Sequence, residues 1–246
     1  TLHGRRIAFL PRHGRGHYLT PNEVPYRANI YALKSLGVRY IISVSACGSL
    51  REDFSPGHIV IPEQLFDFTK HRVGSFFEEG LVAHLSPAHP FSPELGQALA
   101  AAVGKFTESL HDGGTFITIE GPRFSTKGES NLYRQWGMSI IGMTTSPEAF
   151  LAAEAEIAYT VMAHVTDYDV WHDMEEPVTV EKVIRVLQAN TQLAQQAISQ
   201  LVKDMDNWAG EMAAHQGMKD ALITNQDLIP AETRAKLKLL VGRYLD

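Results

Sequence analysis

Two aspartates, Asp167 and Asp169, follow an almost uncharged stretch of strand length that runs from Ile157 to Thr166. The stretch is rich in β-branched and aromatic residues, which is typical of a buried parallel strand in an α/β sheet. Ligands of such sheets bind beyond the carboxyl ends of the strands. Because side chains alternate along an extended chain, we expect the two carboxyl groups to point the same way, into one site.

A pair of carboxyl groups at one strand end is compatible with three roles. It can bind a divalent metal, but His164 and His172 are not placed on the same pleat in a metal-ligand spacing, which disfavours this role. It can recognise adenine, whose N7 accepts and whose amino group donates, if one carboxyl is protonated and the other ionised. It can also simply cap a turn, since Asp is common in turns. This stretch by itself leaves the last two roles open.

A basic turn follows the first expected strand, which covers residues 5–11. The turn reads Arg12-His13-Gly14-Arg15-Gly16-His17. Arginine offers a bidentate fork and glycine lets backbone N–H groups approach, so the turn is suited to hold a phosphate or another oxyanion. A basic surface loop explains the same residues equally well.

The next two elements are a helix over 25–36, which Gly37 ends, and a strand over 38–46. The strand leads into a small turn, Ala46-Cys47-Gly48-Ser49. Cys47 is a candidate nucleophile, but a single cysteine in a tight apolar turn is more typical of an inert packing residue.

The rest of the chain alternates strands and helices. Strands are expected over 58–62, 63–68, 114–120 and 138–143. Three helices are expected to begin at a cap: one from Pro93 to about 106 with Ser92 as N-cap, one after a capping box of Thr126 and Glu129, and one from Pro147 with Ser146 as N-cap. Two more helices are expected, one from Thr179 past Leu201 and one from near Pro230. Residues 70–90 are irregular, and loops of this length are usually functional or interfacial.

Composition narrows the class of protein. With 246 residues, 44% hydrophobic and 20% charged, the chain is long enough for one large α/β domain. The net charge is −6 and no Lys/Arg run is present, so we do not expect nucleic acid as a partner. A single cysteine excludes an internal disulfide framework. No signal peptide or apolar run of spanning length is visible, so we expect a cytoplasmic protein without membrane contacts.

Five runs together resemble the 5′-methylthioadenosine phosphorylases of the purine nucleoside phosphorylase superfamily. The runs are Ala28-Asn-Ile-Tyr-Ala-Leu-Lys34, Ala46-Cys-Gly-Ser-Leu-Arg51, Thr118-Ile-Glu-Gly-Pro-Arg-Phe-Ser125, Met143-Thr-Thr-Ser-Pro-Glu148 and Thr166-Asp-Tyr-Asp-Val-Trp171. The similarity extends from about Arg5 to Leu201 and more loosely to the C-terminus. It implies the α/β nucleoside phosphorylase fold, in which helices flank a mixed, partly barrel-like sheet, and assembly as a homotrimer.

The resemblance also implies roles for residues at matching positions. Phosphate would be held by Arg12, His13, Ser45, Ala46 and Thr144. The nucleoside would be held by Phe124 on the purine, Ser125 near its edge, Met143 under the ribose, and Val180 and Val183 around the 5′ group. His84 would reach that pocket from a neighbouring subunit. Asp167 would donate to N7 and Asp169 would accept from the amino group. Inorganic phosphate would be the co-substrate, with no metal and no organic cofactor.

The implied reaction is the phosphorolysis of 5′-methylthioadenosine to adenine and 5-methylthioribose 1-phosphate. Cleavage builds positive charge on the sugar and negative charge on the purine, so N7 needs a proton or a hydrogen bond and the anomeric carbon needs an anion beneath it. For Asp167 to hold a proton at neutral pH, its pKa must be raised by burial and by its neighbour. Two valines offer no donor to a 5′ hydroxyl, so we expect a thioether to be preferred.

Three features depart from the family pattern. The usual first strand with its Gly-rich phosphate turn is not in this sequence, so we expect 1–246 to be a single domain lacking that element. Gly142 stands where these enzymes usually have Asn, as in other purine nucleoside phosphorylases, and Ser45 replaces a Thr. The alternatives are therefore another purine nucleoside phosphorylase, a nucleosidase, or a non-catalytic purine-binding homologue.

Overall fold

The computed structural model describes residues 1–172 and 180–245, without the side chains at 180, 182, 183 and 185–189. Within the described residues, no helix has both the length and the apolar composition needed to cross a bilayer.

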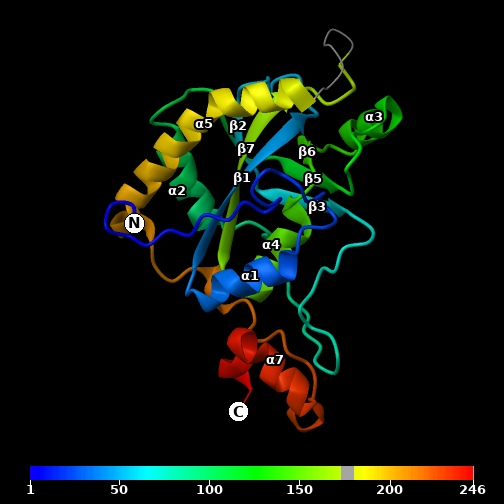
Figure 1. Ribbon diagram of the computed structural model, residues 1–246, viewed down its shortest axis with the longest axis vertical. Helices are drawn as coiled ribbons and strands as arrows, with labels where there is room; N and C mark the ends of the chain where they lie inside the picture. Colours follow the sequence, from blue (N-terminus) through cyan, green and yellow to red (C-terminus); the bar gives the residue numbers. More distant parts are fainter. Residues whose placement is uncertain (173–179, 246) are drawn as a thin grey trace.

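A mixed seven-stranded sheet forms the centre of the described structure, in the order β3-β5-β6-β1-β7-β2-β4 (Figure 1). The two long central strands pair in parallel, while β6 runs antiparallel to β1 and β2 runs antiparallel to β7. The strands are β1 (Tyr40–Ser49), β2 (Ile59–Ile61), β3 (Gln64–Phe68), β4 (Leu110–Asp112), β5 (Thr115–Ile119), β6 (Ile140–Gly142) and β7 (Ala158–Asp167). The mixed sheet that we expected is confirmed, and the short strand β4 was missed.

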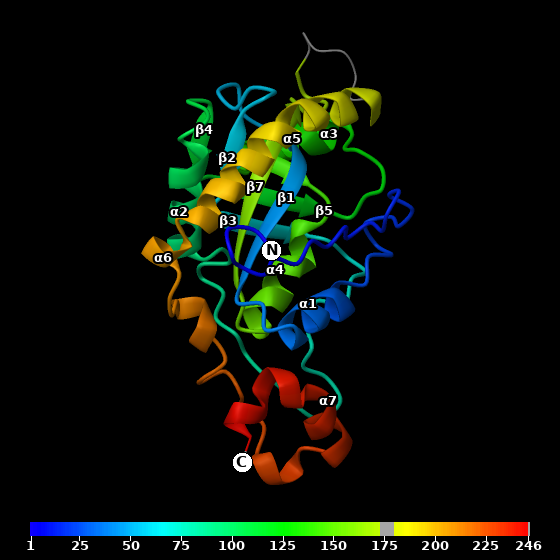
Figure 2. The same cartoon turned by 60° about the vertical axis from the view of Figure 1, so that its left-hand side comes forward.

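Helices cover both faces of the sheet. Leu99 of α2 and Ala197 of α5 pack with Met162 of β7 on one face. On the other face, Ile30 of α1 and Leu151 of α4 join the core that contains Val161. Figure 2 shows α7 away from the sheet, next to α1. The helices are α1 (Tyr26–Ser35), α2 (Pro93–Val103), α3 (Lys127–Gln135), α4 (Thr145–Glu154), α5 (Val180–Lys203), α6 (Met205–Trp208) and α7 (Ala231–Val241), and 3-10 turns cover Ala213–Gln216, Gln226–Leu228 and Gly242–Tyr244.

Helix starts follow the predicted caps at two places. The Ser92 hydroxyl accepts from the N–H of Leu95 and begins α2. Before α3, Thr126 and Glu129 form a reciprocal capping box. These short-range signals positioned α2 and α3 correctly, although α2 ends at Val103, earlier than predicted.

One local prediction is wrong and another holds only in part. Residues 6–11 form no strand, and Phe9 is 79% exposed, because this segment finds no partner in the sheet. Helix α4 spans Thr145–Glu154 with Thr144 as its N-cap, but Ser146 is extended, with φ of −100° and ψ of 137°, so regular helix resumes at Pro147, the predicted first helical residue. The Ser146 hydroxyl makes no hydrogen bond to the described residues, so it does not act as the predicted cap.

Strand β7 is buried along its whole length, as its apolar sequence predicted. His164 lies on the α2/α5 side of this strand, paired in register with Ala46 and Ile59. Its side chain is fully buried, and neither ring nitrogen has a hydrogen-bond partner among the described residues. Burial lowers the pKa of His164 to about 4. The imidazole is therefore neutral in the folded protein at pH values where the unfolded chain begins to protonate it.

Because the folded pKa of His164 is depressed, its contribution to stability is present above about pH 6.5 and is lost as pH falls toward 4. We expect His164→Leu to keep or raise the free energy of unfolding at pH 7.5. Between pH 7.5 and pH 5 the wild type should lose about 2 kcal/mol of its free energy of unfolding because of this histidine, and the variant should not. Urea unfolding at both pH values measures this. His215→Leu is the control: that imidazole bonds to Met212 and Arg39, so its loss should destabilise at pH 7.5. An unchanged pH dependence in His164→Leu contradicts the prediction.

Candidate active site

Asp167 is the last residue of β7 and is 4% exposed. Its Oδ2 accepts from the Thr166 hydroxyl at 2.6 Å, and its Oδ1 accepts from the N–H of Asp169 at 2.8 Å. Gly48 faces it across the β1/β7 register shift, where a Cβ would stand 3.1 Å from Asp167 Oδ1 and 3.3 Å from Asp169 Cβ. A glycine here lets both aspartates approach β1.

Asp169 joins the pair by a route that the sequence did not predict. The chain leaves the extended conformation after β7, and Asp169 has a φ of 51°, so strand alternation is not what places its side chain. Burial raises the pKa of Asp169, while the neighbouring hydroxyls of Ser130 and Ser125 and the Val170 N–H oppose the rise. Neither hydroxyl makes a hydrogen bond of standard geometry, and Asp169 Oδ2 has no partner in the described residues. Asp169 thus has a carboxyl oxygen and two hydroxyls beside it available for a ligand.

The predicted purine and ribose residues lie on neighbouring segments. Ser125 and Phe124 precede α3, and Phe124 is 39% exposed. Met143 follows β6, and a Cβ on Gly121 would lie 2.6 Å from its sulfur. Gly121 has a φ of 64°, so this turn needs a glycine for both its backbone and its closeness to Met143.

Arg12 is not a free cation on a surface loop. Its Nε and Nη2 donate to the two oxygens of Glu148 at 2.8 Å each, and Nη2 also donates to the Ser43 hydroxyl at 2.6 Å. Burial disfavours the charged form, but Glu148 outweighs it, and the pKa of Arg12 is raised. The alternative of a basic surface loop therefore does not hold for Arg12, whose guanidinium lies against β1 and α4.

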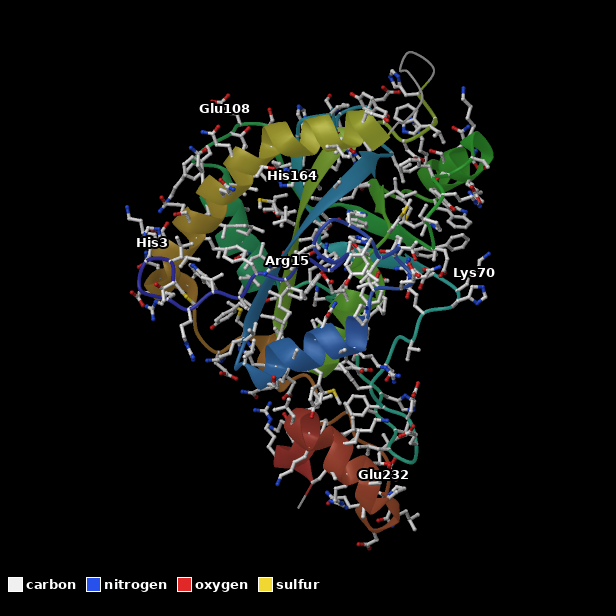
Figure 3. All side chains as sticks on the ribbon, in the orientation of Figure 1. His3, Arg15, Lys70, Glu108, His164 and Glu232 are labelled. Atoms are coloured by element: carbon white, nitrogen blue, oxygen red, sulfur yellow. The ribbon has the colours of Figure 1, made fainter. Side chains whose placement is uncertain are left out.

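His13 lies beside this pair. Its Nδ1 contacts the Leu19 carbonyl at 2.9 Å, and its ring stacks on His17 with centroids 4.2 Å apart. Burial lowers the pKa of His13 against the opposing hydrogen bond to Leu19. Burial of His13 therefore favours its neutral imidazole. The same loop carries Arg15, which Figure 3 labels over the middle of the sheet.

Three further phosphate candidates come from the same two elements that hold Arg12. Ser45 lies two residues after Ser43 on the same buried side of β1, and its hydroxyl donates to the Ala46 carbonyl at 3.2 Å. Thr144 is buried at the start of α4, one turn before Glu148. The fold thus brings the loop, β1 and α4 together, although no strand precedes the loop.

Sequence reasoning did not single out Arg72. This side chain is 2% exposed and enters from the long loop after β3. It donates to the carbonyls of Met143 at 2.5 Å, Ser146 at 2.7 Å and Glu120 at 2.6 Å. Arg72 therefore ties the ends of β5 and β6 to the start of α4. The predicted irregular stretch 70–90 was the signal that could have found it.

The remaining site predictions lie elsewhere. The side chains of Val180 and Val183 are outside the described residues. His84 is exposed on the long loop, and its backbone N–H donates to the backbone carbonyl of Ala221, near the C-terminal segment. In this chain His84 is thus held with the C-terminal elements rather than with the aspartates.

Other candidate chemistry is not supported in the described part. No group of three or more His, Cys, Asp or Glu side chains there is arranged to hold a metal ion. Burial raises the pKa of Cys47 well above its usual value, which fits a packing residue. A cavity of about 660 Å³ lies between α1 and α7, and three of its charged lining residues are engaged: Lys34 donates to the Ala155 carbonyl and Arg243 pairs with Glu156. The first contact joins α1 to the end of α4, and the second joins the turn after α7 to Glu156.

Comparison with known proteins decides the family. A sequence profile of the phosphorylase superfamily matches residues 1–203. This chain belongs to the phosphorylase superfamily. Among superfamily members, an S-methyl-5′-thioadenosine phosphorylase of Chloroflexus aurantiacus is 54% identical over 99% of this chain and 84% of its own. One from Synechocystis is 50% identical over 99% of this chain and 76% of its own.

Solved superfamily structures agree with the fold. A methylthioadenosine phosphorylase from an antarctic soil metagenomic library matches with a TM-score of 0.89 at 49% identity, covering 95% of this chain and 82% of that one. The Schistosoma mansoni methylthioadenosine phosphorylase in complex with adenine matches with a TM-score of 0.76 at 36% identity, over 80% of this chain and 76% of that one. The predicted nucleoside phosphorylase fold is confirmed.

We expect Arg72→Met to lower the free energy of unfolding by about 3 kcal/mol or more, because several buried carbonyls lose charge-assisted hydrogen bonds at once. Arg27→Met is the matched control, since Arg27 forms an exposed ion pair with Glu78 that is worth at most about 1 kcal/mol. Chemical denaturation of both variants makes the comparison. Equal losses in the two variants argue against a structural role for the buried arginine.

Asp169 gives a pH-dependent prediction. Because its folded pKa is raised, the stability linked to its protonation is present at low pH and is lost as pH rises through that pKa. Asp169→Asn should therefore be more stable than wild type at pH 7.5. The difference in stability between variant and wild type should narrow toward pH 4, because a free Asp has a pKa of about 3.9. Thermal unfolding across this range tests the sign. A variant that loses stability equally at every pH contradicts it.

Proposed function

We infer that this protein catalyses the phosphorolysis of 5′-methylthioadenosine, releasing adenine and 5-methylthioribose 1-phosphate, and is thus a pentosyltransferase. The observation that carries this inference is 54% identity over 99% of the chain to an S-methyl-5′-thioadenosine phosphorylase. Adenine is also the ligand named for a structural relative at 36% identity. The reaction salvages a purine and the thioribose carbon skeleton.

For the leaving purine, we propose that Asp167 donates a proton to N7 while Asp169 accepts from the amino group. The Thr166 hydroxyl lies within reach of both Asp167 Oδ2, at 2.6 Å, and the Cys47 carbonyl, at 3.2 Å. When this hydroxyl turns toward the carbonyl, it no longer donates to Oδ2, which can then carry a proton. Protonation at N7 offsets the negative charge that develops on the purine as the glycosidic bond breaks.

For the nucleophile, we propose that inorganic phosphate binds against Arg12 and His13 on one side and Ser45, Ala46 and Thr144 on the other. A phosphate there is both the attacking group and the anion that stabilises the cationic sugar. No metal or organic cofactor takes part in this scheme. Phe124, Ser125 and Met143 would contact the purine and ribose.

We further propose a cytoplasmic homotrimer built from one domain per chain. Val180 and Val183 would line the 5′ pocket and favour the methylthio group over a hydroxyl. His84 would complete the pocket of a neighbouring subunit. Its exposure and its place beside the C-terminal segment support this role, because they leave the imidazole available to another chain.

The test measures adenine release from 5′-methylthioadenosine with and without inorganic phosphate. We expect release to require phosphate, and Asp167→Asn to lower kcat/KM by roughly 10²- to 10⁴-fold, the range typical of a lost general acid. Asp112→Asn is the control, since that aspartate ends β4 on an exposed edge. Adenosine as a second substrate reports the 5′ preference.

Each alternative activity gives a different result. Release of adenine that ignores phosphate identifies a nucleosidase. Binding of adenine without turnover identifies a non-catalytic homologue. Turnover of 6-oxopurine nucleosides in preference to 6-aminopurine nucleosides identifies a different purine nucleoside phosphorylase. An Asp167→Asn variant as active as wild type rules out the proton-donor role.

A further inference from the structure

Glu148 is a buried carboxylate that the proposed reaction does not use directly. It lies in α4 and is 5% exposed. Its two oxygens accept from Nε and Nη2 of Arg12, both at 2.8 Å, in a bidentate pair. Such pairs fix the plane of the guanidinium as well as its position. A carboxylate buried this deeply must be held by partners on every side.

Two further side chains complete this arrangement. The Tyr159 hydroxyl donates to Glu148 Oε1 at 2.9 Å, and the tyrosine is 2% exposed in β7. The Ser43 hydroxyl accepts from Arg12 Nη2 at 2.6 Å, and Ser43 is 3% exposed in β1. The network joins the loop that carries Arg12 to β1, α4 and β7, so the guanidinium is anchored to the rigid part of the fold.

The network leaves one part of the guanidinium for a ligand. Arginine has five N–H donors. The contacts above occupy Nε–H and both protons of Nη2, and no described residue accepts a hydrogen bond from Nη1. An oxyanion that approaches Arg12 would therefore meet Nη1, in an orientation set by Glu148.

We propose that Glu148 is a positioning residue for phosphate, acting through Arg12 and itself oriented by Tyr159. This inference rests on the proposed function, because it takes phosphate as the ligand of Arg12. Two effects of Glu148 oppose each other: its geometry aims the guanidinium, whereas its charge partly neutralises it. The proposal assigns the role to geometry.

Three substitutions separate geometry from charge. Glu148→Asp keeps the charge but is one methylene too short to hold both nitrogens in place, so the KM for phosphate should rise about tenfold, equivalent to about 1.4 kcal/mol. Glu148→Gln removes the charge and keeps the length of the side chain, but its amide nitrogen cannot accept from Arg12, so the KM for phosphate should rise here as well. Tyr159→Phe removes only the orienting hydroxyl and should raise the phosphate KM by about threefold. The KM for the nucleoside should stay within twofold in all three variants.

Glu154→Asp is the matched control. Glu154 is a buried carboxylate in the same helix, but it accepts from Ser75 and from the N–H of Phe76 instead of from Arg12. Its truncation should lower the thermal midpoint without changing the phosphate KM. A purely structural role of Glu148 would give this same result in Glu148→Asp and would overturn the proposal.

A binding measurement keeps this test separate from that of the activity. Inorganic phosphate alone should raise the thermal midpoint of wild type, and the rise should shrink in Glu148→Asp but persist in Glu154→Asp. Absence of adenine release by wild type would reject the proposed function while leaving this measurement intact. The positioning role is wrong if phosphate gives no shift in wild type, or if Glu148→Gln tightens phosphate while Glu148→Asp leaves it unchanged.

Discussion

The parallel pairing of β1 with β7 is the constraint on which the rest of the structure depends. The two strands stay in register from Tyr40 and Ala158 to Cys47 and Val165. Since β7 is buried on both faces, helices must cover both sides of the sheet. The same pairing brings the ends of both strands to one edge, where the register shift at Gly48 accommodates the carboxyl groups that follow β7.

Buried arginines attach the irregular segments to this frame. Arg12 meets a carboxylate, so its charge is neutralised locally, whereas Arg72 meets mainly backbone carbonyls. In both cases a cation removed from water is stable only when its donors are matched. The hydrogen bonds of each arginine can therefore form in only one conformation of its loop. The loops gain a fixed position without regular secondary structure, which is how residues far apart in sequence come to share one site.

Features with local causes were predictable from the sequence. The caps at Ser92 and Thr126 depend on side chains within a few residues, and the apolar run of β7 reports burial directly. Features that need a distant partner were not. Residues 6–11 are apolar enough for a strand, but no other strand pairs with them. The 3 residues of β4 form a strand because they pair with β2. Arg72 likewise acquires its role only through carbonyls that lie more than 40 residues away.

The sequence by itself determined the α/β class, the resemblance to the methylthioadenosine phosphorylases and the aspartates at the end of the central strand. The tertiary structure decided how those groups are held. Asp169 reaches the site through a left-handed turn rather than through strand alternation. Arg12 is paired with Glu148, 136 residues away, rather than exposed. Residue types and spacings record which chemistry is available, but the ionisation and orientation of a buried group depend on the charges and donors that surround it, and only the folded chain assembles those.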